Sequence, residues 1–338
     1  MRFGFDEDQI EIQRTASGLL EARSTLEQVR IHADEGGDDR ALWTELCELG
    51  WPGIAVSEQY GGQGYGSVEL AILLEQAGRT MTSVPLFSTA AAALAIESAG
   101  SDEQRDRWLP GLASGETTAA VGTAGNGRAE IVAGRVDASV AVLFDDEGGA
   151  RLIDLADALV EPTATIDPTR SYLAIQGPGD DLPGDTDAAL DRARVALAAE
   201  LTGVASRATE LTVAYVKDRK QFGTPIGAYQ AVSHRCASMF LAVESSRSVT
   251  YHAAWAADAA PDRLSEAAAV AHTVVIDASR EATCSAIQAH GGIGFTWEAD
   301  PHWFYKRAQI GAYLLGGTTE ARAQLADLVS ERLDDQND

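Results

Sequence analysis

One group of side chains in this sequence is best suited to bind a phosphate-bearing ligand. It consists of Arg219, Gln221 and Phe222, followed by Gln230. A guanidinium binds a pyrophosphate through several directed donors, whereas an ammonium acts as a point charge. The residue types therefore favour Arg219 as a diphosphate ligand. An arginine that follows a helix is, however, more often only a solvated surface charge, so this segment alone is a weak signal.

A second candidate segment lies further along the chain and contains Gln288, Gly291, Gly292 and Gly294. Glycine has no Cβ, so backbone amides at these positions can come close to a nucleotide, and positive φ angles cost little there. The Gln288 amide can offer both a donor and an acceptor to a ribose or phosphate. A glycine run by itself usually indicates only a turn. The two segments are informative because both occur, in this order.

Both segments resemble the flavin-binding motifs of the acyl-CoA dehydrogenase family. The stretch 218–226 resembles the turn that contacts the FAD of a neighbouring subunit, and 288–295 resembles the family's second FAD motif. A third segment, 315–321, resembles the family's terminal Glu-Gly-Thr-x-Gln turn. The resemblance implies that FAD is the cofactor and that the residues contacting it are Arg219, Gln221, Phe222, Gln230, Gln288, Gly291, Gly292 and Thr318.

The third segment departs from the family pattern at the catalytic position. Gly316 stands where most members carry the glutamate that removes the α proton of the acyl thioester, and a glycine cannot accept a proton. Some members place the glutamate ten residues before a Leu-x-Gly segment, where this chain has Ala193, with Asp191 two places away. Glu320, which replaces a glutamine, is a further poor candidate. We therefore expect no catalytic residue in this chain, with the roles of Asp191 and Glu320 left open.

The elements that must position these residues fall into three regions. Apolar spacing of three and four predicts helices in an N-terminal domain, residues 1–116, and in an alanine-rich C-terminal four-helix bundle, residues 185–338. Between them, short apolar runs such as Val140 to Phe144 and Leu173 to Ile175, separated by Gly, Asp and Pro, predict strands of a reduced β domain, residues 117–184. The fold class is mostly α and acyl-CoA dehydrogenase-like. The signatures that hold the flavin ring in the family are missing: the first site reads Val121-Gly122-Thr123-Ala124-Gly125-Asn126.

Composition excludes several classes of function. The 338 residues include 51 acidic and 26 basic ones, and the resulting net charge of -25 disfavours nucleic acid and anionic lipid as partners. The sequence contains no run of about 18 apolar residues, so we expect no membrane insertion. Three widely spaced cysteines, Cys47, Cys236 and Cys284, predict buried free thiols in a reducing compartment. We therefore expect a cytoplasmic protein.

A chain that has the FAD motifs but no catalytic base resembles the smaller subunit of heterotetrameric acyl-CoA dehydrogenases. Many of these complexes act on steroid side-chain CoA thioesters. The resemblance implies a homologous partner subunit in an α2β2 assembly, an acyl-CoA substrate, and electron-transfer flavoprotein as the electron acceptor. Two alternatives remain: a self-sufficient homotetrameric enzyme with a displaced base, and a structural paralogue without cofactor.

Overall fold

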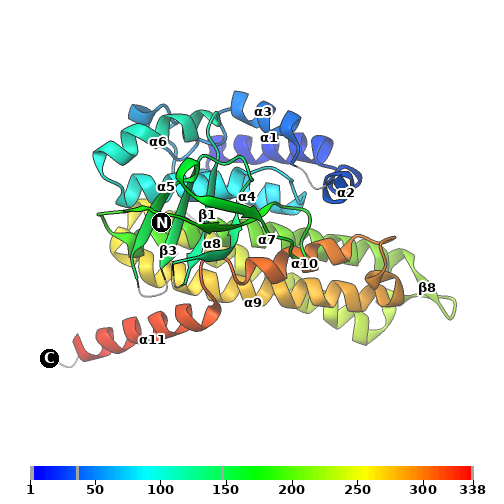
Figure 1. Cartoon of the computed structure of the whole chain (residues 1–338). Coiled ribbons are helices and arrows are strands. Elements are labelled where there is room, and N and C mark those ends of the chain that lie inside the picture. Colours follow the sequence, from blue (N-terminus) through cyan, green and yellow to red (C-terminus); the bar gives the residue numbers. More distant parts are fainter. Residues whose placement is uncertain (1–3, 36–37, 126, 146–147, 336–338) are drawn as a thin grey trace.

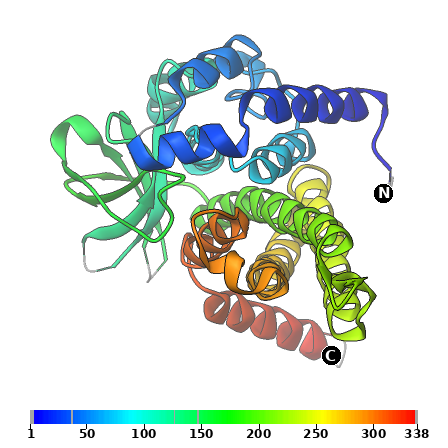
Figure 2. The same cartoon turned by 90° about the vertical axis from the view of Figure 1, so that its right-hand side faces the viewer.

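The chain folds into three adjacent parts, which Figure 1 shows as N-terminal helices, a sheet and a bundle of long helices. The computed structural model describes residues 4–35, 38–125, 127–145 and 148–335. Figure 2 shows the sheet at one side of the molecule, next to both the N-terminal helices and the bundle.

The N-terminal part consists of helices whose starts are fixed by polar caps. Asp6, Asp39 and Ser101 each accept a hydrogen bond from a backbone N–H in the first turn of the helix that follows. The helix α5, rich in alanine, is buried along nearly all of its length and packs on α6, β1 and α7, so it connects the three parts. The helices are α1 (Glu7–Arg23), α2 (Leu26–Glu35), α3 (Arg40–Glu48), α4 (Ser67–Arg79), α5 (Leu86–Ala99) and α6 (Asp102–Ser114), with the short 3₁₀ helix η1 (Glu58–Tyr60) before α4.

The sheet has the strand order β5-β6-β2-β1-β3-β4-β7, in which β1 pairs parallel with β3 and the other ladders are antiparallel. The described strands are β1 (Ala119–Ala124), β2 (Ala129–Ala133), β3 (Val140–Asp145), β4 (Ala150–Asp154), β5 (Leu159–Pro162), β6 (Tyr172–Gln176) and β7 (Asp180–Asp181), with η2 (Leu155–Asp157) after β4. Both faces of β1 are covered by this chain. Val121 joins the main hydrophobic core, and Ala120 joins a separate apolar cluster that lies within the β region.

The bundle is built on α7, whose 33 residues also contact the N-terminal part. Gly78 of α4 and Gly203 of α7 let these two helices touch backbone to backbone. A Cβ at Gly78 would lie 2.0 Å from the Glu200 carbonyl oxygen, and one at Gly203 would lie 1.9 Å from that of Glu75. The bundle comprises α7 (Thr186–Asp218), α8 (Gln230–Ala259), α9 (Leu264–His290), α10 (Pro301–Gly311) and α11 (Thr318–Asp335), together with the short elements β8 (Lys220–Gln221), β9 (Thr224–Pro225), η3 (Ile226–Ala228), η4 (Pro261–Arg263) and η5 (Gly291–Phe295).

A buried ion cluster joins the loop between β5 and β6 to the bundle. Arg307 of α10 is fully buried, and its Nε donates to Asp167 Oδ2 at 2.7 Å while its Nη1 donates to Glu200 Oε1 at 3.3 Å. Burial alone would raise the pKa of Asp167, but Arg307 and hydrogen bonds from Thr169 and Tyr172 hold it below its usual value. Such a cluster is costly to break, because removing one partner leaves a buried charge unpaired.

The structure confirms a mostly helical fold with a small sheet. The strands expected around Val140 and Leu173 are present as β3 and β6, and the apolar stripes in the N-terminal region lie on α3 and α4. Among the described residues, no helix is both long and apolar enough to cross a bilayer. The three cysteines are free, but the expectation that they are buried is wrong: Cys47 and Cys236 are half-buried, and Cys284 is exposed on α9.

Candidate functional site

The first candidate motif forms a tight hairpin that projects from the end of the bundle, at the far right of Figure 1. Helix α7 ends at Asp218, and the chain reverses direction at Phe222 and Gly223, whose φ angles are 53° and 81°. Two successive positive φ angles are typical of the turn that joins two antiparallel strands without splaying them. A bulky residue rarely adopts such a φ angle. The turn places the Phe222 ring at the hairpin tip, where 94% of its surface is exposed.

The second motif begins in the last turn of α9 and continues through η5. The chain leaves α9 at Gly291, where φ is 64°, and a Cβ added at Gly291 or Gly292 would meet no atom within 4 Å. The backbone of both glycines is therefore open to a ligand. The His290 ring stacks on Tyr215 of α7 with centroids 4.2 Å apart, so the end of α9 is held against the helix that leads into the hairpin.

Arg219 is an exposed cation at this end of the bundle. Its side chain is exposed, and within the described residues its guanidinium has neither a hydrogen bond nor a carboxylate within 4 Å. The neighbouring Gln221 and Gln230 are also exposed. Because a free guanidinium, side-chain amides and open glycine backbone are the groups that bind a diphosphate, this surface fits the adenosine diphosphate half of FAD.

The structure brings seven of the eight expected cofactor residues to this end of the bundle and leaves Thr318 apart. Thr318 begins α11, next to the turn at Gly316, and the Gly316 oxygen contacts His272 of α9. From His272 to Gln288 is 16 residues along one helix, which corresponds to roughly 24 Å at 1.5 Å per residue. The two groups of residues therefore face different regions of space.

The turn at Gly316 is closed by buried polar side chains from α7 and α9. Arg194 Nε donates to the Leu315 oxygen at 3.1 Å, and His272 Nε2 donates to the Gly316 oxygen, also at 3.1 Å. A Cβ at Gly316 would lie 3.1 Å from Arg194 Nη2. A buried cation therefore stands beside the position at which a catalytic carboxylate was expected from the family pattern.

Two acidic side chains lie near this arginine: Asp191 and Glu320, whose roles as catalytic bases the sequence left undecided. Asp191 is 2% exposed, with Oδ1 3.7 Å from Arg194 Nη1, and burial raises its pKa to about 7 in spite of the arginine. Glu320 is exposed. Burial together with Arg194 lowers the pKa of His272 to about 4, so this imidazole is neutral at pH 7.

Sequence reasoning missed Arg194 and His272 as neighbours of Gly316. The available signal was the pair Asp191 and Arg194, three residues apart on a helix whose other residues in this stretch are largely apolar. Nothing in the sequence marked His272. The expected absence of a flavin-ring cradle concerned 121–126, of which Asn126 lies outside the described residues. Within β1, only Thr123 is not buried by this chain, so the strand offers little open surface to a ring.

Comparisons with known proteins agree with this architecture. Residues 6–116 match the family model of the acyl-CoA dehydrogenase N-terminal domain, and residues 185–330 match that of the C-terminal domain. Acyl-CoA dehydrogenase IpdE2 of Mycolicibacterium smegmatis is 34% identical over 321 residues, which cover 94% of this chain and 98% of that protein.

Two solved structures have the same overall fold. A variant of the Tcur3481-Tcur3483 steroid ACAD superposes with a TM-score of 0.86 at 30% identity, covering 97% of this chain and 99% of the other. The ChsE4-ChsE5 complex from Mycobacterium tuberculosis superposes with a TM-score of 0.88, covering 98% of this chain and 99% of the other. Its sequence identity of 24% makes the second likeness one of fold alone.

Proposed function

This chain belongs to the acyl-CoA dehydrogenase family of flavoprotein oxidoreductases, and from that premise we propose that it is the base-lacking subunit of a heteromeric, FAD-dependent acyl-CoA dehydrogenase. A homologous partner supplies the catalytic glutamate and the pocket for the flavin ring. One contrast carries the proposal. The Arg219 guanidinium of the hairpin is exposed and has no partner among the described residues, whereas the turn at Gly316 is closed by Arg194.

The roles of this chain's residues follow from their positions. Arg219 binds the FAD diphosphate, the backbone of Gly291 and Gly292 approaches it, and the Gln288 amide contacts a ribose or phosphate oxygen. Phe222, at the exposed hairpin tip, would contact the cofactor. Three further residues complete the proposed cofactor set: Gln221, Gln230 and Thr318.

When bound, FAD would supply the acceptor for the hydride that leaves the β carbon of the acyl thioester. This chain orients the cofactor's nucleotide half and contributes no proton acceptor, because the position of the base is a glycine beside a buried cation. Because the FAD motifs lie at the end of the bundle, away from this chain's own Gly316 turn, a cofactor held there would serve an active site completed by the neighbouring subunit.

The finer assignments rest on the same reasoning. We propose an α2β2 assembly in the cytoplasm, with domains at 1–116, 117–184 and 185–338. Because one relative is described as a steroid ACAD, the proposed substrate is a steroid side-chain CoA thioester. The proposed electron acceptor is an electron-transfer flavoprotein.

Expression of the chain alone and with a longer homologue from the same genome tests the assembly. We expect the isolated chain to retain little FAD and to aggregate, because exposed apolar side chains such as Phe222, Phe240 and Leu241 are left uncovered. Co-expression should restore solubility and yield a yellow complex, as measured by flavin absorbance and gel filtration. A chain that is stable, saturated with FAD and reduced by acyl-CoA on its own would instead identify a homotetrameric enzyme. A colourless, inactive complex would identify a structural paralogue.

A further inference from the structure

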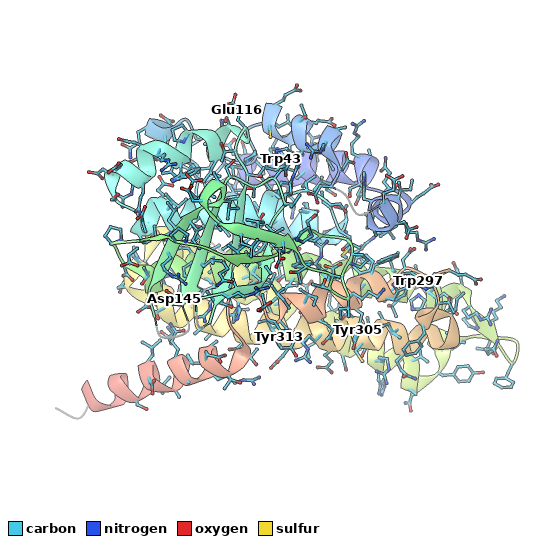
Figure 3. The ribbon with its side chains drawn as sticks, viewed as in Figure 1. Trp43, Glu116, Asp145, Trp297, Tyr305 and Tyr313 are labelled. Atoms are coloured by element: carbon cyan, nitrogen blue, oxygen red, sulfur yellow. The ribbon has the colours of Figure 1, made fainter. Side chains whose placement is uncertain are left out.

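A cavity of about 590 Å³ opens between the C-terminal end of α9, the 3₁₀ helix η5 and the first turns of α10. Its walls include Phe295, Trp297 and Tyr305, and Ile166 of the loop between β5 and β6 closes one side; Figure 3 labels Trp297 and Tyr305. We name it the Trp297 pocket. Its size lies in the range of small-molecule sites.

His302 lines the Trp297 pocket with two nitrogens that have no partner. The residue is 7% exposed, and neither Nδ1 nor Nε2 has a hydrogen bond within the described residues. Burial, with the nearby Lys306, lowers the pKa of His302 to about 4, so the ring is a neutral imidazole with one donor and one acceptor. Leaving a buried polar group unpaired costs free energy, which a ligand with a complementary polar edge would recover.

Lys306 provides a positive charge on the same wall. Its ammonium lies 4.2 Å from the centre of the Trp297 ring and 5.0 Å from that of Trp303, and among the described residues it has no carboxylate within 4 Å. The residues described as lining the pocket include no aspartate or glutamate, although the whole chain has 51 acidic residues. The pocket therefore combines a cation with apolar rings.

The walls of the pocket are held in place before any ligand arrives. Ile166 precedes Asp167, and Lys306 precedes Arg307, so the buried Asp167–Arg307 ion pair joins the two walls at a Nε–Oδ2 distance of 2.7 Å. His302 also packs on Trp303 and Trp297, with ring centroids 4.4 Å and 4.9 Å away. A preformed pocket loses little conformational freedom on binding, which favours affinity.

From these features we infer that the Trp297 pocket binds a flat ring system that carries one anionic group. The ring lies against Trp297 and Phe295, the anion pairs with Lys306, and a polar substituent on the ring edge pairs with His302. Two sources supply this chemistry: a fused-ring carboxylate, and an adenosine phosphate. Because Gln288 lines the pocket as well as the proposed flavin surface, the second source would make the pocket a continuation of that surface.

Calorimetric titration of the full chain, in the assembly in which it purifies, tests the inference with matched probes. The probes are naphthalene-2-carboxylate, its 6-hydroxy derivative, the uncharged naphthalene-2-methanol, and ADP. We expect at least one anionic probe to bind. Lys306→Met should weaken that binding about tenfold or more, because a charged pair is lost, while Lys306→Arg should keep most of it. Lys217→Met, which removes a lysine outside the pocket, is the control.

His302→Phe tests the polar edge separately. We expect the hydroxylated carboxylate to bind the parent protein several times more tightly than the plain carboxylate, and His302→Phe to abolish that difference. Binding of ADP but not of the carboxylates, with the same Lys306 dependence, assigns the nucleotide source. Carboxylate binding that ignores Lys306→Met, equal binding of the uncharged alcohol, or the absence of any probe whose binding depends on Lys306 overturns the inference. The inference rests on the proposed function only where the ligand is ADP, because Gln288 belongs to both surfaces; the carboxylate outcomes are independent of it.

Discussion

Two regions of the bundle, one near His290 and one near His272 of α9, differ in what the neighbouring arginine contacts. Near His290, Arg219 is exposed and free of any carboxylate among the described residues, and the glycine backbone beside it is open. Near His272, Arg194 is buried and bonded to the Leu315 oxygen and to Gln324 Oε1. The first arginine is available to a ligand, and the second stabilises the fold.

The difference explains how a chain can retain one part of a site and lose another. An exposed guanidinium contributes little to the stability of the folded state, so Arg219 can bind a ligand without weakening the fold. A buried guanidinium must be paired by its own chain. Arg194 therefore fixes the turn at Gly316, and a Cβ at that position would lie 3.1 Å from its Nη2.

The largest effect that should separate the two regions is on stability. We expect Arg194→Met to lower the free energy of unfolding by about 3 kcal/mol at pH 8, because Asp191 is then a buried charge without its partner. The loss should be smaller at pH 5, since the pKa of Asp191 is about 7 in the folded protein and the carboxyl is protonated there. Urea denaturation at both pH values measures this.

The pH dependence has a definite sign. The folded-state pKa of Asp191 lies above its ordinary value of 3.8, so the native state binds the extra proton between about pH 4 and pH 7. This group therefore removes stability as pH rises through that range.

Arg219→Met is the matched control for Arg194→Met. A change of more than about 0.5 kcal/mol in the free energy of unfolding of Arg219→Met would contradict the contrast between the two arginines.

The second effect concerns cofactor affinity. Arg219→Ala in the assembled complex should weaken FAD binding roughly tenfold or more, because a charge-assisted contact to the diphosphate is lost. Arg219→Lys should recover part of the affinity, since lysine keeps the charge but not the planar fork. Flavin released during dialysis measures both. Unchanged flavin content in Arg219→Ala would show that the hairpin faces something other than FAD.

A third test places a carboxylate at the turn. Gly316→Glu should yield no second active site, because the new side chain would start 3.1 Å from Arg194 Nη2 and pair with it. The φ angle of 85° should also cost about 1 to 3 kcal/mol of stability. Anaerobic flavin reduction by acyl-CoA provides the readout. Twice the reduced flavin per complex would mean that the turn is a working base position.

The smallest expected effect is that of Glu320→Gln. Because Glu320 is exposed on α11, its loss should leave turnover with acyl-CoA within a few fold of the parent. Replacing the partner's catalytic glutamate should lower turnover by about 10² or more. If Glu320→Gln abolished flavin reduction while FAD stayed bound, this chain would carry its own base.

Much of the fold could be predicted because it depends on local patterns. Apolar spacing of three and four indicated α3 and α4, and short apolar runs between glycines indicated β3 and β6. The cysteines show the limit of such reasoning. Cys284 lies in a helix, and helical periodicity alone did not reveal that its position faces outward near the end of α9.

The sequence by itself determined the family, the mostly helical fold and the absence of a carboxylate at Gly316, since motifs and residue identities are local properties of the chain. The tertiary structure decided what surrounds that glycine. Arg194 and Leu315 are 121 residues apart in the sequence, yet they share a hydrogen bond because α7 packs beside α9 and the turn that follows α10. Burial then fixes the electrostatics: the same residue type is a free surface charge at 219 and a paired, enclosed charge at 194, and only packing distinguishes them.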